Sequence, residues 1–253
     1  MESLFDSLRW GHIVVGSAGL VAFWIPLFAK KGGRLHIRGG KVFEYAAYFV
    51  TGTAIFNSFG RLITALVGGA TLAENREAFG FLIFLGYLGI VVLASVRQAV
   101  RVAQVKKDVS ALKTPFHLGL AVAGIIGSVT VIAYALLAWS SVSVVLLALS
   151  PIGIMQGLGM LRFIYDPPPE RMSWWYAHMG NMLGAGIGFY TAFAVFGSSR
   201  LFDITLTGAL NFVPWILPAA LGIPANVIWE RYYRRKFRDL PRKGSRAEAK
   251  TAV

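Results

Sequence analysis

The sequence predicts an all-α membrane protein, a bundle of seven transmembrane helices, and two observations lead to this fold class. Apolar residue types make up 56% of the 253 residues and charged types only 15%, whereas about 25% charged residues is usual in a soluble domain. The apolar residues also gather in seven runs, each near the length of about 20 residues that a helix needs to cross a bilayer. This composition excludes a disordered chain, a coiled coil and an ordinary soluble enzyme.

The seven runs follow one another along the chain, with polar connections between them. They are Trp10–Ala29, Phe43–Gly69, Phe79–Val96, Phe116–Trp139, Val142–Ile164, Trp174–Phe196 and Leu206–Trp229. Their length and their lack of strict alternation favour helices over the strands of a membrane barrel. The first run is expected to be a true span and no cleavable signal, because the preceding segment Met1–Arg9 is acidic rather than basic.

The basic residues predict how the bundle sits in its membrane. Most of the 25 Lys and Arg residues fall in the first, third and fifth connections and after the last run. Because positively charged loops stay in the cytoplasm, we expect the N-terminus outside and the C-terminus inside, in a multi-pass protein of the bacterial cytoplasmic membrane. This topology, together with attraction to anionic lipid headgroups, explains the net charge of +13 without a nucleic-acid partner.

The chain is expected to hold one transmembrane helical domain, residues 1–243, followed by a disordered basic tail, residues 244–253. The segment Trp229–Leu240 repeats aromatic residues at helical spacing among arginines. This pattern predicts that the last helix continues along the inner interface, where aromatic side chains anchor it.

Small residues and prolines predict how the helices pack. Small-residue stripes let membrane helices approach closely, and two occur here: Gly153 with Gly157, and Gly180 with Gly184 and Gly188. Proline removes a backbone donor and tends to kink a helix, and the last run contains Pro214, Pro218 and Pro224. This last helix is therefore expected to be kinked, either as plain structure or as the lining of a gate.

Three histidines are expected at the same, cytoplasmic, end of the bundle. His36 falls in the first connection, His117 opens the fourth helix behind an N-cap at Thr114 and a proline at Pro115, and His178 lies about one turn into the sixth helix. Imidazole is a common metal and haem ligand, so the group predicts a transition-metal or b-type haem site. The alternative is that helix ends at the interface simply tolerate histidine, and we favour this alternative for His117 and for His12 at the opposite end.

Glu44 and Asn181 complete the candidate cofactor site of His36, Glu44, His178 and Asn181, with His117 as an optional member. Glu44 opens the second helix, where the helix dipole alone explains an acidic residue; pairing with His36 or His178 is the other interpretation. Asn181 lies three residues after His178 and so on the same helix face. No catalytic residue and no definite set of metal ligands is assigned.

Several known classes lack their motifs in this sequence. Microbial rhodopsins carry a lysine in the last helix, and Leu206–Trp229 contains none. The motifs of phosphate-binding loops, dinucleotide-binding helices, zinc proteases and lipases are also absent. Since the chain has no cysteine, disulfides, zinc–thiolate sites and iron–sulfur clusters are excluded as well.

Two stretches resemble a family of uncharacterised bacterial polytopic membrane proteins. The stretch from His36 to Lys41 resembles the H-x-x-x-G-[KR] loop of that family, although Ile37 stands where members often carry arginine. The stretch from His178 to Met182, followed by Thr-Ala-Phe, resembles its later H-x-x-x-M helix. The likeness extends over roughly Pro26 to Phe196. It implies that His36 and His178 matter together, but the family has no established activity and so implies no reaction.

Three functions stay open at this point, and so does the question whether the protein is an enzyme. The first is a redox or metal-handling role at the histidines. The second is transport of a small solute along Asn57, Arg61, Gln156 and Asn181, with an anionic solute favoured because Arg61 has no acidic partner in the core. The third is a non-catalytic accessory or assembly subunit that binds other membrane proteins through its glycine seams.

Overall fold

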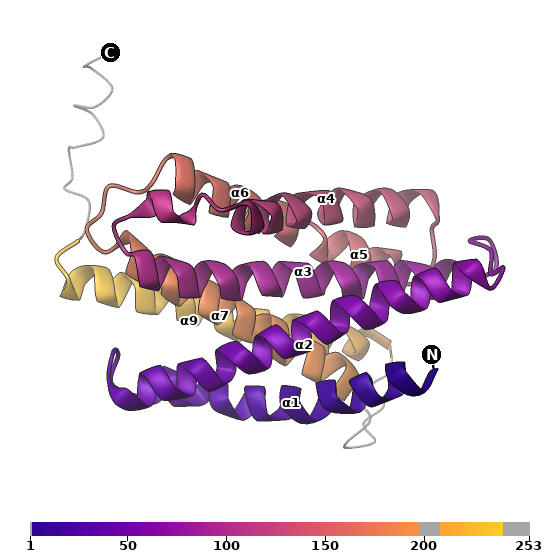
Figure 1. Ribbon diagram of the computed structural model, residues 1–253, viewed down its shortest axis with the longest axis horizontal. Helices are drawn as coiled ribbons and strands as arrows, with labels where there is room; N and C mark the ends of the chain where they lie inside the picture. The colour runs from indigo at the N-terminus through magenta and orange to yellow at the C-terminus, as the bar shows by residue number, and fades with distance from the viewer. Residues whose placement is uncertain (1, 198–207, 240–253) are drawn as a thin grey trace, which may run out of the picture.

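The computed structural model describes residues 2–197 and 208–239, and within these ranges the chain is helical and contains no strand. Seven helical spans of the described chain are long and apolar enough to cross a bilayer. Figure 1 shows them side by side, with the N-terminus at one end of the bundle and the last helix ending at the other. The predicted helical class and the predicted number of helices long and apolar enough to cross a membrane are therefore confirmed.

The helices are named in chain order. They are α1 Glu2–Phe28, α2 Arg34–Val67, α3 Arg76–Val105, the short turn η1 Val109–Leu112, α4 Pro115–Leu137, α5 Ser143–Leu149, α6 Pro151–Tyr165, α7 Ser173–Ala192, the π-helical turn η2 Phe193–Gly197, η3 Gly208–Phe212 and α9 Val213–Lys236. Together α5 and α6 make one span, and α7 continues into η2 as another.

Several helices begin earlier than the apolar runs predict. The first was expected from Trp10 and the second from Phe43, whereas α1 begins at Glu2 and α2 at Arg34. An apolar run marks only the hydrocarbon core, about 30 Å thick, while the 34 residues of α2 span about 51 Å. Polar residues extend the helix into the interface. His36 consequently lies in the first turn of α2, which corrects its expected place in a loop.

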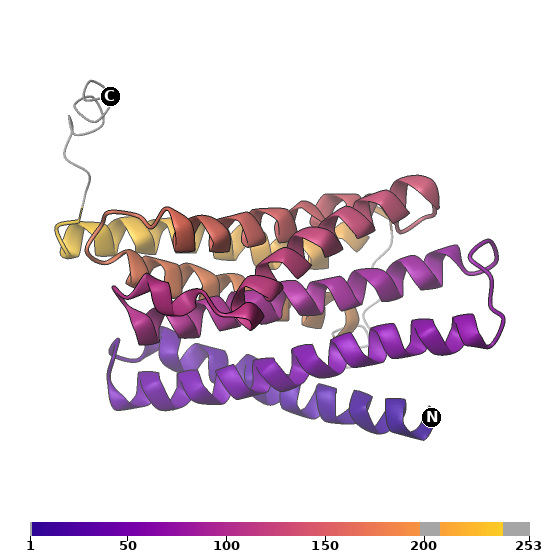
Figure 2. The same cartoon turned by 45° about the horizontal axis from the view of Figure 1, so that its top comes forward.

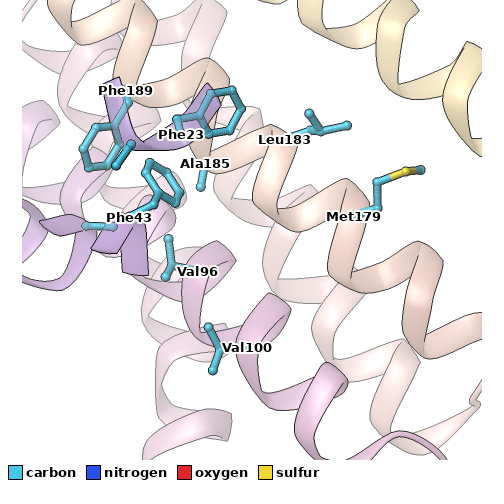
Figure 3. Packing of buried hydrophobic residues seen from close by; sticks show 10 residues of the cluster. Phe23, Phe43, Val96, Val100, Met179, Leu183, Ala185 and Phe189 are labelled. Carbon is cyan, nitrogen blue, oxygen red and sulfur yellow. The ribbon is translucent and has the colours of Figure 1, made fainter. Parts of the chain in front are cut away.

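α3 lies at the centre of the bundle and separates two hydrophobic cores. It packs against α2, α4, α6 and α7 (Figure 2). The first core fills the space between α1, α2, α3 and α7, and Figure 3 shows its side chains. The second core lies between α3, α4 and α5, around the buried rings of Phe84 and Tyr87. Because α1 and α3 each contact both α2 and α7, the latter two helices face each other across the first core.

The fifth span is broken in the middle, which the sequence analysis did not predict. One continuous helix was expected over Val142–Ile164, but α5 ends at Leu149 and α6 begins at Pro151. Proline has no backbone N–H and its ring crowds the preceding turn. The Tyr87 hydroxyl crosses from α3 to close the gap, since it donates to the Ser150 carbonyl at 2.6 Å and accepts from the Gly153 backbone N–H at 2.8 Å. The Ser128 hydroxyl also donates to that carbonyl.

The variant Tyr87→Phe is expected to destabilise the fold by about 1–2 kcal/mol, because it removes two buried hydrogen bonds and leaves the Gly153 N–H only a longer one, to the Ser150 carbonyl at 3.3 Å. Chemical unfolding in detergent micelles measures the change. Tyr45→Phe is the matched control, since Tyr45 is exposed and its loss is expected to stay within about 0.5 kcal/mol. Equal stability of Tyr87→Phe and the wild type contradicts the role assigned to this hydroxyl.

The predicted seam at Gly153 and Gly157 is confirmed, whereas the stripe on α7 packs only in part. An ideal Cβ built on Gly153 lies 2.6 Å from the Gly124 carbonyl oxygen, and one on Gly157 overlaps a backbone oxygen of α4. On α7, a Cβ at Gly188 meets Val92 at 3.0 Å, but one at Gly184 meets nothing within 4 Å. The stripe therefore does not form one continuous seam.

α9 lies at the edge of the described bundle, packed mainly on α7. Pro218 and Pro224 lie inside one continuous helix that ends at Lys236. The helix thus extends past Trp229 as predicted, while Leu240 and the expected disordered tail at 244–253 lie outside the described residues. Orientation in the membrane and the choice of membrane stay predictions from the charge pattern.

Candidate functional site

Three histidines lie toward one end of the bundle, which we call the histidine end. It is formed by the connections α1–α2, α3–α4 and α6–α7, which gather at the left in Figure 1. His36 stands in the first turn of α2, His117 in the first turn of α4 and His178 in the second turn of α7. His12 does not lie at the opposite end as expected, because α1 begins at Glu2. It lies near the middle of α1, where its Nδ1 is 2.9 Å from the Thr53 hydroxyl.

The structure brings His36 and His178 together. Their ring centroids lie 6.3 Å apart and their planes meet at 62°, although the two residues belong to helices that face each other across the first core. Phe23, Phe43 and Phe189 fill that core (Figure 3). The two imidazoles therefore close the end of an aromatic core between α2 and α7.

Hydrogen bonds fix the orientation of both rings. His36 Nδ1 lies 3.0 Å from the Pro26 carbonyl oxygen, and His178 Nδ1 lies 2.9 Å from that of Ala99. A carbonyl oxygen only accepts, so each Nδ1 carries the hydrogen and donates it. In the neutral ring, Nε2 then keeps its lone pair, and neither Nε2 makes a hydrogen bond within the described chain. Histidine ligands of metals show the same arrangement, with the second nitrogen bonded to a carbonyl or carboxylate.

Local sequence explains why His36 can reach its partner. The last carbonyls of a helix lack intrahelical partners, and α1 ends two residues after Pro26. Gly39 lets α2 approach this point, because an ideal Cβ there would lie 2.6 Å from the side chain of Ile25. The free carbonyl at the end of α1 thus becomes the acceptor that orients His36.

Lys31 places a positive charge beside the pair. Its ammonium donates to the carbonyls of Pro26 and Leu27 at 2.9 and 2.6 Å and lies 5.8 Å from the ring centroid of Trp229. Burial lowers the pKa of Lys31. No carboxylate is among the groups that act on His178, which are His36 and Lys31.

Glu44 does not join the histidine pair. Its electrostatic neighbours are Lys41, Tyr48 and Arg97, because Glu44 lies two turns along α2 from His36, on a face turned toward α3. Of the two earlier interpretations, pairing with a histidine therefore has no support in this geometry. Glu44 also does not open the helix, since α2 begins at Arg34.

Asn181 and His117 belong to a second polar group, between α3, α4, α6 and α7. Gln156 donates from its amide nitrogen to the Asn181 side-chain oxygen at 2.8 Å. His117 is buried, with Nε2 2.7 Å from the Gln98 side-chain oxygen. A cavity of about 180 Å³ lies beside Gln98, Gln156 and Asn181. Three amide side chains thus line one part of it, while Met160, Phe163 and Ala177 line the rest.

Two other expectations are settled by the geometry. The N-cap of the fourth helix is confirmed, since Thr114 accepts from the His117 backbone N–H at 3.3 Å and α4 begins at Pro115. Arg61 was expected to have no acidic partner in the core, and the partner it does have is an exposed one, since its guanidinium lies 3.5 Å from the Asp6 carboxylate. Asp6 became available because α1 starts at Glu2 rather than at Trp10.

Sequence reasoning missed Gln98, Arg97 and Lys31. The first two fall just beyond the third apolar run, which was ended at Val96, whereas α3 continues to Val105. Extending each run by the extra length that a helix needs to cross the interface would have identified both as polar groups within a span. Lys31 carried no signal, because it stood among several basic residues of the first connection.

The described residues contain no group of three or more His, Cys, Asp or Glu side chains that could hold a metal ion by themselves. A metal at the histidine pair would therefore need other ligands. Comparison with protein-family models, curated proteins and solved structures finds no match to this chain.

Proposed function

We propose that this multi-pass membrane protein binds a metal centre through His36 and His178 and uses it in one-electron transfer or in handling of the cofactor. The observation that supports this function is the pair itself. Two imidazoles from facing helices lie 6.3 Å apart, and both donate from Nδ1 to a backbone carbonyl. A metal–nitrogen bond is about 2 Å long. Two such bonds, added to the distance from each ring nitrogen to its ring centroid, give a separation of this order between the centroids.

A b-type haem suits the surroundings of the pair better than a bare divalent ion. The pair offers two neutral ligands beside the ammonium of Lys31, and no acidic ligand completes a set among the described residues. A bare ion would place two further positive charges there, which is costly in partly buried surroundings. A porphyrin brings four nitrogen ligands and its own negative charge, and Lys31 is placed to pair with a carboxylate of such a group.

The proposed location is the cytoplasmic side of a bacterial inner membrane, because the histidine end carries the basic connections. His36 and His178 would hold the iron, while backbone carbonyls of α1 and α3 keep their rings oriented. The bound group would supply reversible one-electron chemistry. A single centre near one face favours exchange of electrons, or of the cofactor, on that side alone.

Titration of the purified protein with ferric haem tests the proposal. We expect a shifted absorption band that saturates at one haem per chain, and elemental analysis of protein dialysed against Zn²⁺ or Cu²⁺ measures the bare-ion alternative. If the protein binds Zn²⁺ or Cu²⁺ tightly but does not bind haem, the histidine pair is a metal site and the assignment to haem is wrong. Binding of neither would contradict the proposed function.

The cavity beside Gln98, Gln156 and Asn181 favours a second candidate, passage of a small polar solute. Its volume of about 180 Å³ exceeds the roughly 30 Å³ that one water molecule occupies in the liquid. No charged residue lines it, so a neutral solute fits better than an anionic one. Osmotic swelling of proteoliposomes in urea or acetamide tests this candidate, and swelling no faster than that of empty liposomes would contradict it.

A further inference from the structure

A cluster of four polar side chains between α2 and α3 is not used by the histidine pair. We call it the Arg97 cluster: Lys41, Glu44, Tyr48 and Arg97, which lie within electrostatic reach of one another. The three residues of α2 follow at spacings of three and four, which puts them on one face of that helix. Arg97 comes from α3, so the cluster lies between two neighbouring helices.

The Tyr48 hydroxyl and the Arg97 Nε are enclosed atoms on half-buried side chains. Neither atom has a hydrogen bond of good geometry within the described chain, although the Tyr48 hydroxyl lies close enough to Arg97 and Glu44 to interact with both. Glu44 forms no ion pair within 4.0 Å there either, so Arg97 is not neutralised by it at close range. Enclosed polar atoms are normally paired, so the incomplete pairing of Tyr48 and Arg97 points to a ligand.

The depth of the cluster matches the headgroup region of one leaflet. Arg97 lies eight residues before the end of α3 at Val105, which is about 12 Å along the helix. α3 has 30 residues and is about 45 Å long, so roughly 7 Å of it extends beyond each side of a hydrocarbon core about 30 Å thick. The guanidinium therefore lies a few ångströms below the headgroups and can reach up to a phosphate.

Charge and surroundings select an anionic phospholipid. The guanidinium, the Lys41 ammonium and the Tyr48 hydroxyl are all donors suited to phosphate oxygens, and the two cations outweigh the carboxylate of Glu44. Arg101, one turn further, is already held by Gln104 and by a backbone carbonyl. Val42 and Tyr45 on α2 and Phe116 on α4 are exposed apolar side chains that offer a surface for an acyl chain. The Arg97 guanidinium itself lies 5.5 Å from the ring centroid of Phe116.

We infer that the Arg97 cluster binds the phosphate of an anionic phospholipid from the leaflet at the histidine end. Arg97 and Lys41 hold the phosphate, and Tyr48 donates its hydroxyl. Glu44 repels the phosphate and so limits the affinity. The site is independent of any metal centre at His36 and His178, and its failure would leave the proposed function untouched.

Native mass spectrometry of the full chain in detergent, with added phosphatidylglycerol, tests this inference. Arg97→Gln is expected to weaken lipid binding about tenfold or more, since a hydrogen-bonded charge is lost. Glu44→Gln is expected to strengthen it, because a like charge is removed. Arg61→Gln is the matched control at the opposite end and is expected to bind as the wild type does. Should Arg97→Gln fail to fold, Tyr48→Phe and Arg97→Lys, each expected to weaken binding by a smaller factor, replace it.

Two further arms identify the group that is bound. Diacylglycerol with the same acyl chains has no phosphate, and we expect it to bind at least tenfold more weakly. Inorganic phosphate in excess is expected not to displace the lipid. Equal binding by wild type and Arg97→Gln, equal binding of diacylglycerol, or displacement by inorganic phosphate would each overturn the assignment to a phospholipid.

Discussion

The variant His178→Ala is expected to lose haem binding, with the affinity falling by more than about 100-fold. Residues that merely orient a metal ligand are already worth about 10–100-fold, and removal of the ligand itself costs more. His36→Ala is expected to cause a similar loss, because both rings are placed to hold one centre. Absorption titration with ferric haem measures both changes.

The double variant separates a shared centre from two independent sites. If one centre needs both rings, the double variant (His36→Ala with His178→Ala) is expected to bind haem no more weakly than either single variant. His12→Ala is the control, since His12 lies near the middle of α1, about four turns before Pro26, and is bonded to Thr53. The haem affinity of this variant is expected to match that of the wild type. Full binding by either single variant contradicts the shared site.

The variant Gly157→Val is expected to destabilise the bundle by about 3 kcal/mol. A Cβ on Gly157 would overlap the Ala121 backbone oxygen and lie 2.6 Å from Ile125. A backbone atom cannot move aside as a side chain can, so α6 and α4 would have to separate. Overpacking of this kind typically costs about 1–3 kcal/mol, and a clash with backbone belongs at the upper end of that range.

Gly159→Val provides a control on the same helix. An ideal Cβ at Gly159 meets nothing within 4 Å, so the change is expected to stay within about 0.5 kcal/mol. Unfolding by denaturant in micelles measures both variants. If the two glycines tolerate valine equally, the close approach of α4 and α6 is not a determinant of stability.

The fold was largely predictable because hydrocarbon imposes its thickness on the sequence. Seven apolar runs corresponded to seven spans, since every crossing needs about the same apolar length. Helix ends were not predictable in the same way, because polar residues continue a helix into the interface, as at Glu2 and Arg34. The break before Pro151 was also missed. The backbone groups at the break are bonded by the Tyr87 hydroxyl of α3, and the sequence does not show this contact.

The sequence predicted how deep in the bundle the candidate residues lie, but only partly which neighbours their side chains face. His36 and His178 share a depth that the run boundaries reveal, and the structure brings their rings to 6.3 Å. Glu44 shares roughly that region but points toward Arg97, and Asn181 turns to Gln156. Which face of a helix meets which neighbour depends on the packing order of the helices, and no residue pattern in one chain specifies that order.

The backbone partners of the two histidines were equally hidden. The Pro26 carbonyl is free only because α1 ends just beyond it. The Ala99 carbonyl lies inside α3 and uses its second lone pair to accept from His178. Both acceptors are backbone carbonyl oxygens, so no pattern of side chains in the sequence indicates them.

The electron paramagnetic resonance spectrum of the protein loaded with one equivalent of ferric haem tests the central claim most directly. If both imidazoles bind the iron, the spectrum is that of a low-spin, six-coordinate haem, and it changes in His36→Ala and in His178→Ala alike. A high-spin spectrum, or a low-spin one that neither substitution alters, would contradict a metal centre held between α2 and α7.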